Sequence, residues 1–216
     1  MHSGRVRLGR KERTTGWAYG VPEGITHRTP PPIRVSEELQ NMITVGDRFP
    51  EFTVQACCGI EDSDITQLSS GTFEGKWKTF VFYRKDFTFV CPTELIEFSK
   101  RVSDFEQRDC VIIGASTDNE YAHLAWRRTN DDLKSLPYPL IAASKLARDL
   151  DILDEHENIC HRATYIVDPT GVVQFVSVHP PSVGRSVDEV LRTLAAIQSE
   201  GLCPCNWQHG EQTIAV

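Results

Sequence analysis

The 216-residue sequence has no apolar run long enough to span a membrane and no signal-peptide core after its N-terminal arginines. These absences argue against a membrane protein and predict a cytoplasmic one. An excess of positive charge is also missing: the formal net charge is −7, so nucleic acid is not an expected partner. The seven cysteines are an odd number. In a reducing compartment they are expected to be buried, catalytic or metal-bound rather than joined in a disulfide framework.

Residues 1–41 have little apolar periodicity. They contain the Arg-rich "GRVRLGRKER" and the break "TPPPIR", and their net charge is +3 while the remainder carries −10. Such a stretch buries too little surface to offset its ordering entropy, so we expect disorder or loose packing. Met42 opens "MITVGDRFPEFTV", which is typical of the start of a domain. Residues 1–41 are interpreted as an added extension or a misassigned start, with an organelle transit peptide as a third alternative.

From Met42 onward, strands alternate with helices, which predicts an α/β domain without internal repeats. Buried strands are predicted from short apolar runs at 78–83, 110–116, 138–143, 163–168 and 172–178. Helices are predicted at 93–108, 119–133, 145–153 and 186–198. The segment Pro169-Thr170-Gly171 is expected to form a hairpin turn. The last stretch, about 199–216, has no clear period and predicts a C-terminal arm.

The stretch "DFTFVCPTE" (86–94) places Cys91 between a predicted strand and a predicted helix. Proline is preferred at the first helical position, so Pro92 predicts that Cys91 lies at the helix N-terminus. Free N–H groups and the positive end of the helix dipole there favour a thiolate, the nucleophilic form of cysteine. Thr88 supplies a hydroxyl in the connecting turn, and Glu94 could hold an arginine. A packed core cysteine explains the pattern equally well.

Arg162 lies at the start of a predicted neighbouring strand and could reach the Cys91 helix, although a surface charge is the simpler interpretation. Four ordered blocks then carry a resemblance: "FYRKDFTFVCPTE", "RATYIVDPTG", "SVGRSVDEVLR" and "CPCNW". Together they resemble the peroxiredoxin family over residues 42–216. The similarity is to the alkyl hydroperoxide reductase C type, in its actinobacterial branch with two C-terminal cysteines. It implies a thioredoxin-like fold, with a central mixed β-sheet flanked by helices, and a thiol-dependent peroxidase without metal or organic cofactor.

By this resemblance, Cys91 is the peroxidatic cysteine, which attacks the terminal peroxide oxygen and becomes a sulfenic acid. Thr88 then hydrogen-bonds the peroxide and the thiolate. Arg162 stabilises the thiolate and the charge that develops as the O–O bond breaks. Glu94 orients that arginine.

The resemblance also implies supporting roles for Arg185 and Trp126, although core packing explains Trp126 equally well. One position departs from the family. Its motif carries proline seven residues before the cysteine, where this sequence has Arg84. In relatives that proline shields the thiol from solvent, so Arg84 is expected either to open the pocket or to add positive charge.

Cys203 matches the family's resolving cysteine, which would come from the partner subunit, and Cys205 resembles a second resolving or relay cysteine. A metal site formed by "CPC" with His209 is disfavoured, because a fourth ligand is missing. The segment "HENICH" (156–161) nearly spells a zinc motif, but Cys160 occupies the place of the second histidine. We interpret it as coincidence. The remaining cysteines are expected to serve packing: Cys57, Cys58 and Cys110.

The expected partners also come from the resemblance. Strand 172–178 would join two subunits edge to edge, and the homodimers would assemble into a decameric or dodecameric ring. The expected reductant is a thioredoxin-like or alkylhydroperoxidase D-like disulfide reductant, and the substrate is a hydroperoxide. A ring-forming holdase chaperone or a peroxide sensor is the alternative. A general disulfide oxidoreductase would carry Cys-x-x-Cys at the helix start, where this sequence has Glu94.

Peroxide-sensitive relatives carry a Gly-Gly-Leu-Gly insertion and a C-terminal helix with Tyr-Phe, which together slow unwinding of the peroxidatic helix. The matching stretch here, "NDDLKSLPYPL", has no glycine, and eleven residues follow Cys205. We therefore expect the Cys91 helix to unwind readily and the protein to resist over-oxidation.

Overall fold

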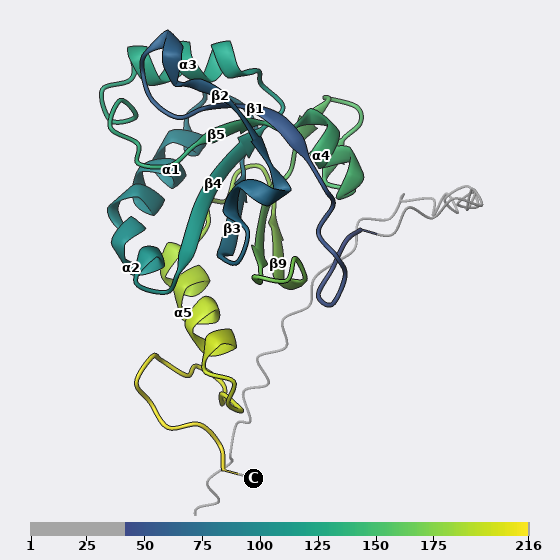
Figure 1. Ribbon diagram of the computed structural model, residues 1–216, viewed down its shortest axis with the longest axis vertical. Helices are drawn as coiled ribbons and strands as arrows, with labels where there is room; N and C mark the ends of the chain where they lie inside the picture. Colours follow the sequence, from purple (N-terminus) through teal and green to yellow (C-terminus); the bar gives the residue numbers. More distant parts are fainter. Residues whose placement is uncertain (1–41, 216) are drawn as a thin grey trace, which may run out of the picture. The chain divides into compact units, whose positions relative to one another are not determined.

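The computed structural model describes residues 42–215, so the predicted extension 1–41 lies outside the described residues (Figure 1). A seven-stranded sheet forms the centre, in the order β2-β1-β5-β4-β3-β8-β9. Its strands are β1 (Thr53–Cys57), β2 (Ile65–Ser69), β3 (Trp77–Phe82), β4 (Cys110–Ser116), β5 (Leu140–Ala142), β8 (Arg162–Val167) and β9 (Val173–His179). Strands β3, β4 and β5 pair in parallel and the other pairs are antiparallel, which confirms the predicted mixed sheet.

Helices flank this sheet, as the α/β pattern predicts. They are α1 (Val90–Lys100), α2 (Val102–Glu106), α3 (Glu120–Thr129), α4 (Ser144–Asp149) and α5 (Val187–Gln198), with short 3-10 turns at Asp62–Asp64 and Ser70–Phe73. A separate two-stranded hairpin is formed by β6 (Leu153–Asp154) and β7 (Ile159–Cys160). In residues 42–215, no helix combines the length and the apolar character needed to cross a membrane.

The predicted helix 93–108 differs from the structure at its start and in its middle. The helix begins earlier, at Val90, so Pro92 is the third helical residue and not the first. Proline is tolerated there because the first-turn N–H groups have no intrahelical partner. The helix then divides at Arg101, whose N–H bonds the Phe98 carbonyl three residues back. The β-branched Val102 follows directly and has low helix propensity, which favours a break at this point.

Two hydrophobic cores lie on opposite faces of the sheet, and β3 contributes to both. Phe80 and Phe82 face one core, whereas Val81 and Tyr83 face the other, because successive strand residues point to opposite faces. The second core contains Cys91 from α1 and the apolar face of α5. The face of the sheet that bears Tyr83 is therefore the one against which the Cys91 helix packs.

The β8–β9 hairpin closes one side of the sheet. Its turn contains Gly171 at φ +86°, a left-handed conformation that glycine adopts without strain, and this confirms the predicted turn. Strand β9 has β8 as its neighbour on one side and is the edge of the sheet. Val178 on β9 is 44% exposed. The first residue of β9, Val173, exchanges backbone hydrogen bonds with Gly46 and Asp47, so another strand can pair with the outer edge of β9 beyond that point.

Candidate active site

Cys91 is the second residue of α1, reached from β3 through a loop of residues 84–89. Its side chain is fully buried in the core between the sheet and the helices. The thiol therefore lies in the first turn of a helix, beside the free N–H groups that the sequence pattern predicts there.

Arg162 is brought to this thiol by the antiparallel pairing of β3 and β8. The register sets Val81 opposite Thr164, so the first residue of β8 lies beside the end of β3, where the loop to Cys91 begins. Its Nη1 donates to the Cys91 sulfur at 3.3 Å and to Glu94 Oε2 at 2.6 Å. Arg162 is only 3% exposed, so it is not the surface charge that the simpler interpretation assumed.

Glu94 is the centre of a buried ion cluster with two arginines. Arg185 donates from Nε to Oε1 at 2.8 Å and from Nη2 to Oε2 at 2.9 Å, while Arg162 holds the same carboxylate from the other side. Burial alone would raise the pKa of Glu94. The hydrogen bonds and charge of Arg185, together with the charge of Arg162, outweigh burial and lower that pKa. Two guanidinium groups and one carboxylate leave an excess of positive charge beside the sulfur.

Thr88 and Trp126 lie outside the ion cluster that Glu94 forms with the two arginines. The Thr88 hydroxyl donates its single proton to the Lys85 carbonyl at 2.8 Å, so it does not donate to the sulfur in this conformation. Trp126 is buried and its ring lies 5.9 Å from that of Tyr83 and 6.1 Å from that of Phe87. These contacts give Trp126 a packing role in the core that contains Cys91.

Comparisons with known proteins agree with this geometry. The sequence profile of the AhpC/TSA family matches residues 45–176. Alkyl hydroperoxide reductase C of Mycolicibacterium smegmatis is 47% identical over 186 residues, which cover 80% of this chain and 94% of that protein. The protein of the same name from Mycobacterium tuberculosis is 44% identical over 184 residues, covering 80% and 94%.

Solved structures are equally similar. Mycobacterium tuberculosis AhpC aligns with a TM-score of 0.72 at 42% identity, over 78% of this chain and all of that one. A reduced Plasmodium vivax 2-Cys peroxiredoxin aligns with a TM-score of 0.74 at 33% identity, over 79% and 92%. The chain belongs to the AhpC/TSA family.

Membership confirms several predictions at once. This AhpC/TSA protein has the thioredoxin-like fold of the peroxiredoxins and is a thiol-dependent peroxidase, an oxidoreductase that acts on peroxides. The family further implies a homo-oligomer. The comparisons do not favour the chaperone or sensor alternative.

The two C-terminal cysteines of this AhpC/TSA protein lie far from Cys91 in the same subunit. Arg185, which bonds Glu94, immediately precedes α5, whereas the Cys203 sulfur lies 3.3 Å from the hydroxyl of Ser199, just past the other end of α5. Figure 1 shows the arm leaving the far end of this helix. The 12 residues of α5 span about 18 Å at ~1.5 Å per residue. Neither Cys203 nor Cys205 is therefore brought to the thiol within one chain.

The other four cysteines are held as thiols by their surroundings. Burial raises the pKa of Cys110 and of Cys160 to about 12, and burial also raises the pKa values of Cys57 and Cys58. Thiols of this kind react slowly, which fits the packing role predicted for Cys57 and Cys110, both of them buried. Cys58 is exposed, so the packing role predicted for it is wrong. Within residues 42–215, no group of three His, Cys, Asp or Glu side chains is arranged to hold a metal ion.

Arg84, at the position of the family's proline, is paired and nearly buried. Its Nη2 donates to Glu157 Oε2 at 2.6 Å, its side chain is 13% exposed, and its Nη1 is buried without a hydrogen-bond partner. Two further buried residues of the same region, Asp86 and His123, were not predicted from the sequence. Both residues lie in segments that the sequence marks: Asp86 is the first residue of the stretch that contains Cys91, and His123 lies on the predicted helix 119–133.

Proposed function

We propose that Cys91 is the peroxidatic cysteine of this peroxidase, with Arg162, Glu94 and Arg185 stabilising its thiolate. One observation carries this assignment: the Arg162 guanidinium is shared between the Cys91 sulfur at 3.3 Å and the Glu94 carboxylate at 2.6 Å. Arg185 holds the other side of the carboxylate, so Glu94 orients the guanidinium without neutralising the whole cluster. A charge-assisted hydrogen bond to the sulfur stabilises the anion that must attack the peroxide.

In the reaction, the thiolate sulfur attacks the terminal oxygen of the hydroperoxide. The S–O bond forms as the O–O bond breaks, and the electron pair leaves on the other oxygen, which takes a proton and departs as alcohol or water. Arg162 faces the oxygens on which this charge develops. Thr88 would rotate its hydroxyl from the Lys85 carbonyl toward the bound peroxide. Cys91 is left as a sulfenic acid.

Resolution would come from Cys203 of the partner subunit. Its thiolate attacks the sulfenic sulfur, the S–S bond forms and water leaves. The distance along α5 within one chain supports an attack from another chain, and Cys205 could act as a second resolving or relay thiol. Either disulfide would then be reduced by a thioredoxin-like or alkylhydroperoxidase D-like dithiol, to which an exposed arm gives access.

We also propose that residues 42–216 form the peroxiredoxin domain in the cytoplasm, with the resolving arm at about 199–216. Turnover of hydrogen peroxide and cumene hydroperoxide by the purified full chain, with dithiothreitol as electron donor, tests the activity. A protein that suppresses aggregation of a client but consumes no peroxide would instead support the holdase alternative.

Reduced protein is expected to be an obligate dimer joined along β9 that assembles into a decameric or dodecameric ring. The exposed edge and the apolar Val178 support the first contact. Phe87 and Phe89, 59% and 93% exposed, offer apolar surface for a second contact. Val178→Lys places a charge on the edge and is expected to give monomers in sedimentation velocity at micromolar concentration. A stable wild-type monomer at that concentration would contradict both contacts.

The protein is expected to resist over-oxidation, because α1 is easily unwound at its start. Its N-cap residue, Phe89, makes no side-chain capping hydrogen bond, and a missing cap costs a helix about 1 kcal/mol. The disulfide should therefore form before a second peroxide reacts. Mass spectrometry after turnover in millimolar peroxide should show Cys91 joined to Cys203 or Cys205. A dominant Cys91 sulfinate would mean that something locks the helix, with Arg84 the first residue to replace.

Arg84→Met is expected to leave the rate of Cys91 oxidation within about threefold of wild type, because exposed or paired charges contribute little. Glu157 already neutralises the guanidinium at 2.6 Å. Stopped-flow fluorescence with hydrogen peroxide measures this rate. A tenfold or larger fall would show that the charge of Arg84 acts on the reaction, as one of the two sequence interpretations holds.

A further inference from the structure

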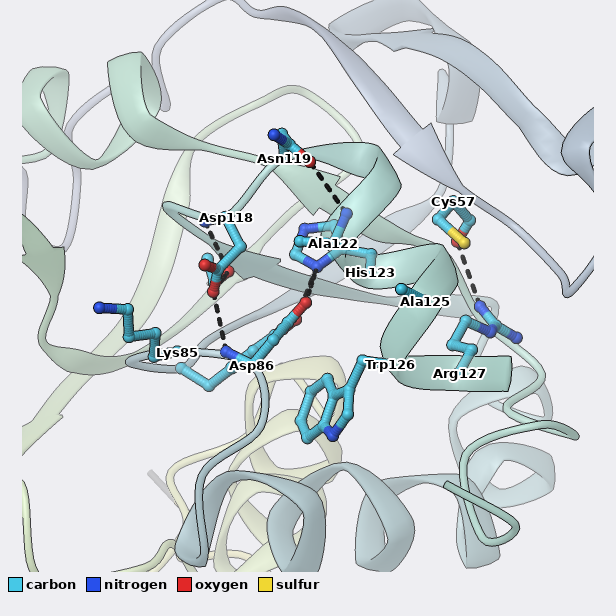
Figure 2. A network of polar contacts seen from close by, with 12 residues as sticks. Cys57, Lys85, Asp86, Asp118, Asn119, Ala122, His123, Ala125, Trp126 and Arg127 are labelled. Carbon is cyan, nitrogen blue, oxygen red and sulfur yellow. Dashed lines mark hydrogen bonds and ion pairs between the residues drawn. The ribbon is translucent and has the colours of Figure 1, made fainter. Parts of the chain in front are cut away.

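The loop of residues 84–89, which leads into the Cys91 helix, is tied to the protein core through Asp86 (Figure 2). The backbone N–H of Asp86 donates at 2.8 Å to Oδ2 of Asp118, which lies in the turn after β4. The Asp86 carboxylate accepts from the Tyr83 hydroxyl at 2.8 Å, and its Oδ2 lies 2.7 Å from His123 Nδ1 on α3. Tyr83 and His123 therefore hold the side chain of Asp86, and Asp118 holds its backbone.

His123 is itself fixed at both ring nitrogens. It is fully buried, and its Nε2 lies 3.3 Å from the Ile141 carbonyl oxygen on β5. A carboxylate only accepts hydrogen bonds, so Nδ1 carries a proton and donates to Asp86. Figure 2 shows the imidazole on α3 directed at Asp86, one turn from Trp126. The position of α3 is thereby transmitted to the loop.

Outside Asp86, the loop is held by the Arg84–Glu157 ion pair and by the Phe87 ring, which lies 6.1 Å from that of Trp126. Phe87 has φ +56°, a left-handed conformation that is strained for an aromatic residue, and it and Phe89 are largely exposed. Thr88 makes its side-chain hydrogen bond within the loop, to Lys85. A strained, exposed segment keeps one conformation only where its surroundings impose it, and here the buried contacts of Asp86 do so.

We propose that Asp86 and His123 are positioning residues of the peroxidase. Their buried contact sets the conformation of residues 84–89 and, through it, the place of the Thr88 hydroxyl relative to the Cys91 sulfur. Neither residue touches the sulfur, so their effect is on geometry and not on the nucleophile itself. This inference rests on the roles proposed above for Cys91 and Thr88. Small displacements of such a group lower reaction rates strongly, by about 100-fold for 1 Å.

Two neutral replacements of similar size separate the loss of the hydrogen bond to Asp86 from the loss of the imidazole ring. In His123→Asn the amide nitrogen takes the place of Nδ1 and can still donate to Asp86. In His123→Gln the amide nitrogen takes the place of Nε2 and keeps the bond to the Ile141 carbonyl, but the donor to Asp86 is lost. Each variant is tested for two rates: oxidation of Cys91 by hydrogen peroxide in stopped-flow fluorescence, and alkylation of Cys91 by iodoacetamide.

His123→Gln should slow oxidation at least about tenfold while alkylation changes less than about twofold, because alkylation does not need Thr88. His123→Asn should remain within about threefold of wild type in both rates, since the donor to Asp86 is kept. Equal slowing of oxidation in both variants would assign the effect to the lost ring and overturn the proposal. So would an unchanged oxidation rate in His123→Gln, or parallel falls in oxidation and alkylation.

If His123→Gln does not fold, Asp86→Ala removes the other partner of the same contact and keeps the ring, while the Tyr83 hydroxyl and His123 Nδ1, 3.3 Å apart, can still pair with each other. It should show the same selective fall in oxidation, and an unchanged rate would overturn the proposal. Failure of the proposed function can be distinguished from failure of this inference by a measurement on the wild-type protein. If peroxide does not oxidise Cys91 in the wild-type protein, the assignment of the peroxidatic cysteine is wrong, whatever the variants do.

Discussion

Cys91→Ser is expected to abolish peroxide reduction, leaving the rate at that of the buffer. A serine hydroxyl is a far weaker acid than a thiol and does not supply the anion that the proposed attack on the peroxide requires. The replacement is nearly isosteric, so the fold and the Arg162–Glu94–Arg185 ion cluster should persist. Loss of turnover would then report chemistry and not unfolding. The measurement is consumption of hydrogen peroxide with dithiothreitol, with circular dichroism to confirm folding.

Cys58→Ser is the matched control. Cys58 is the more exposed thiol, but burial raises its pKa and the buried ion cluster lies elsewhere. The Cys58→Ser variant should keep full activity. This would show that the charges around a thiol decide its reactivity, and that its exposure does not. Appreciable turnover in Cys91→Ser would disprove the assignment of the peroxidatic cysteine.

Arg162→Ala should lower the second-order rate constant for Cys91 oxidation by about 100- to 1,000-fold, the usual effect of removing one donor that stabilises developing charge. The variant loses the hydrogen bond to the sulfur at 3.3 Å. Glu94 keeps both bonds to the Arg185 side chain, so the carboxylate is not left unpaired and the fold should be retained. Stopped-flow fluorescence measures the rate, because Trp126 packs in the core that contains Cys91.

Two further variants test whether the effect of Arg162→Ala comes from the guanidinium group at this position. Arg162→Lys keeps the charge but replaces the planar fork by a point charge, so it should recover only part of the rate. Arg148→Ala removes a surface arginine that bonds Asn158 and should change nothing. An Arg162→Ala protein that is oxidised at the wild-type rate would exclude the electrostatic role.

Much of the fold could be predicted because its signals are local. The apolar runs that became β3 and β4 are short, bounded and buried on both faces, and Gly171 marked the β8–β9 turn. The strand β2 was not predicted, because only Ile65 and Leu68 of its five residues are apolar. The division of the predicted helix at Arg101 was missed as well, since its periodicity continues across the break.

The residues of the candidate active site could likewise be predicted only in part from local sequence signals. From the sequence alone, Cys91 could be placed in the first turn of a helix with Glu94 one turn later, because strand, loop and helix start are consecutive in the chain. The family resemblance, and not any local pattern, pointed to Arg162, whose role stays a prediction.

Which distant groups meet depends on the order and pairing of the strands in the folded protein. Arg162 reaches a sulfur 71 residues away because β8 pairs antiparallel with β3. His123 reaches Asp86 across 37 residues because α3 packs against β1 and β5 and sets the His123 ring beside that of Tyr83, the residue after β3. The structure also directs the Thr88 hydroxyl to Lys85, a choice of rotamer that no sequence pattern encodes. Periodicity reports which face of an element is buried, but the pairing of buried charges depends on the order of strands in the sheet.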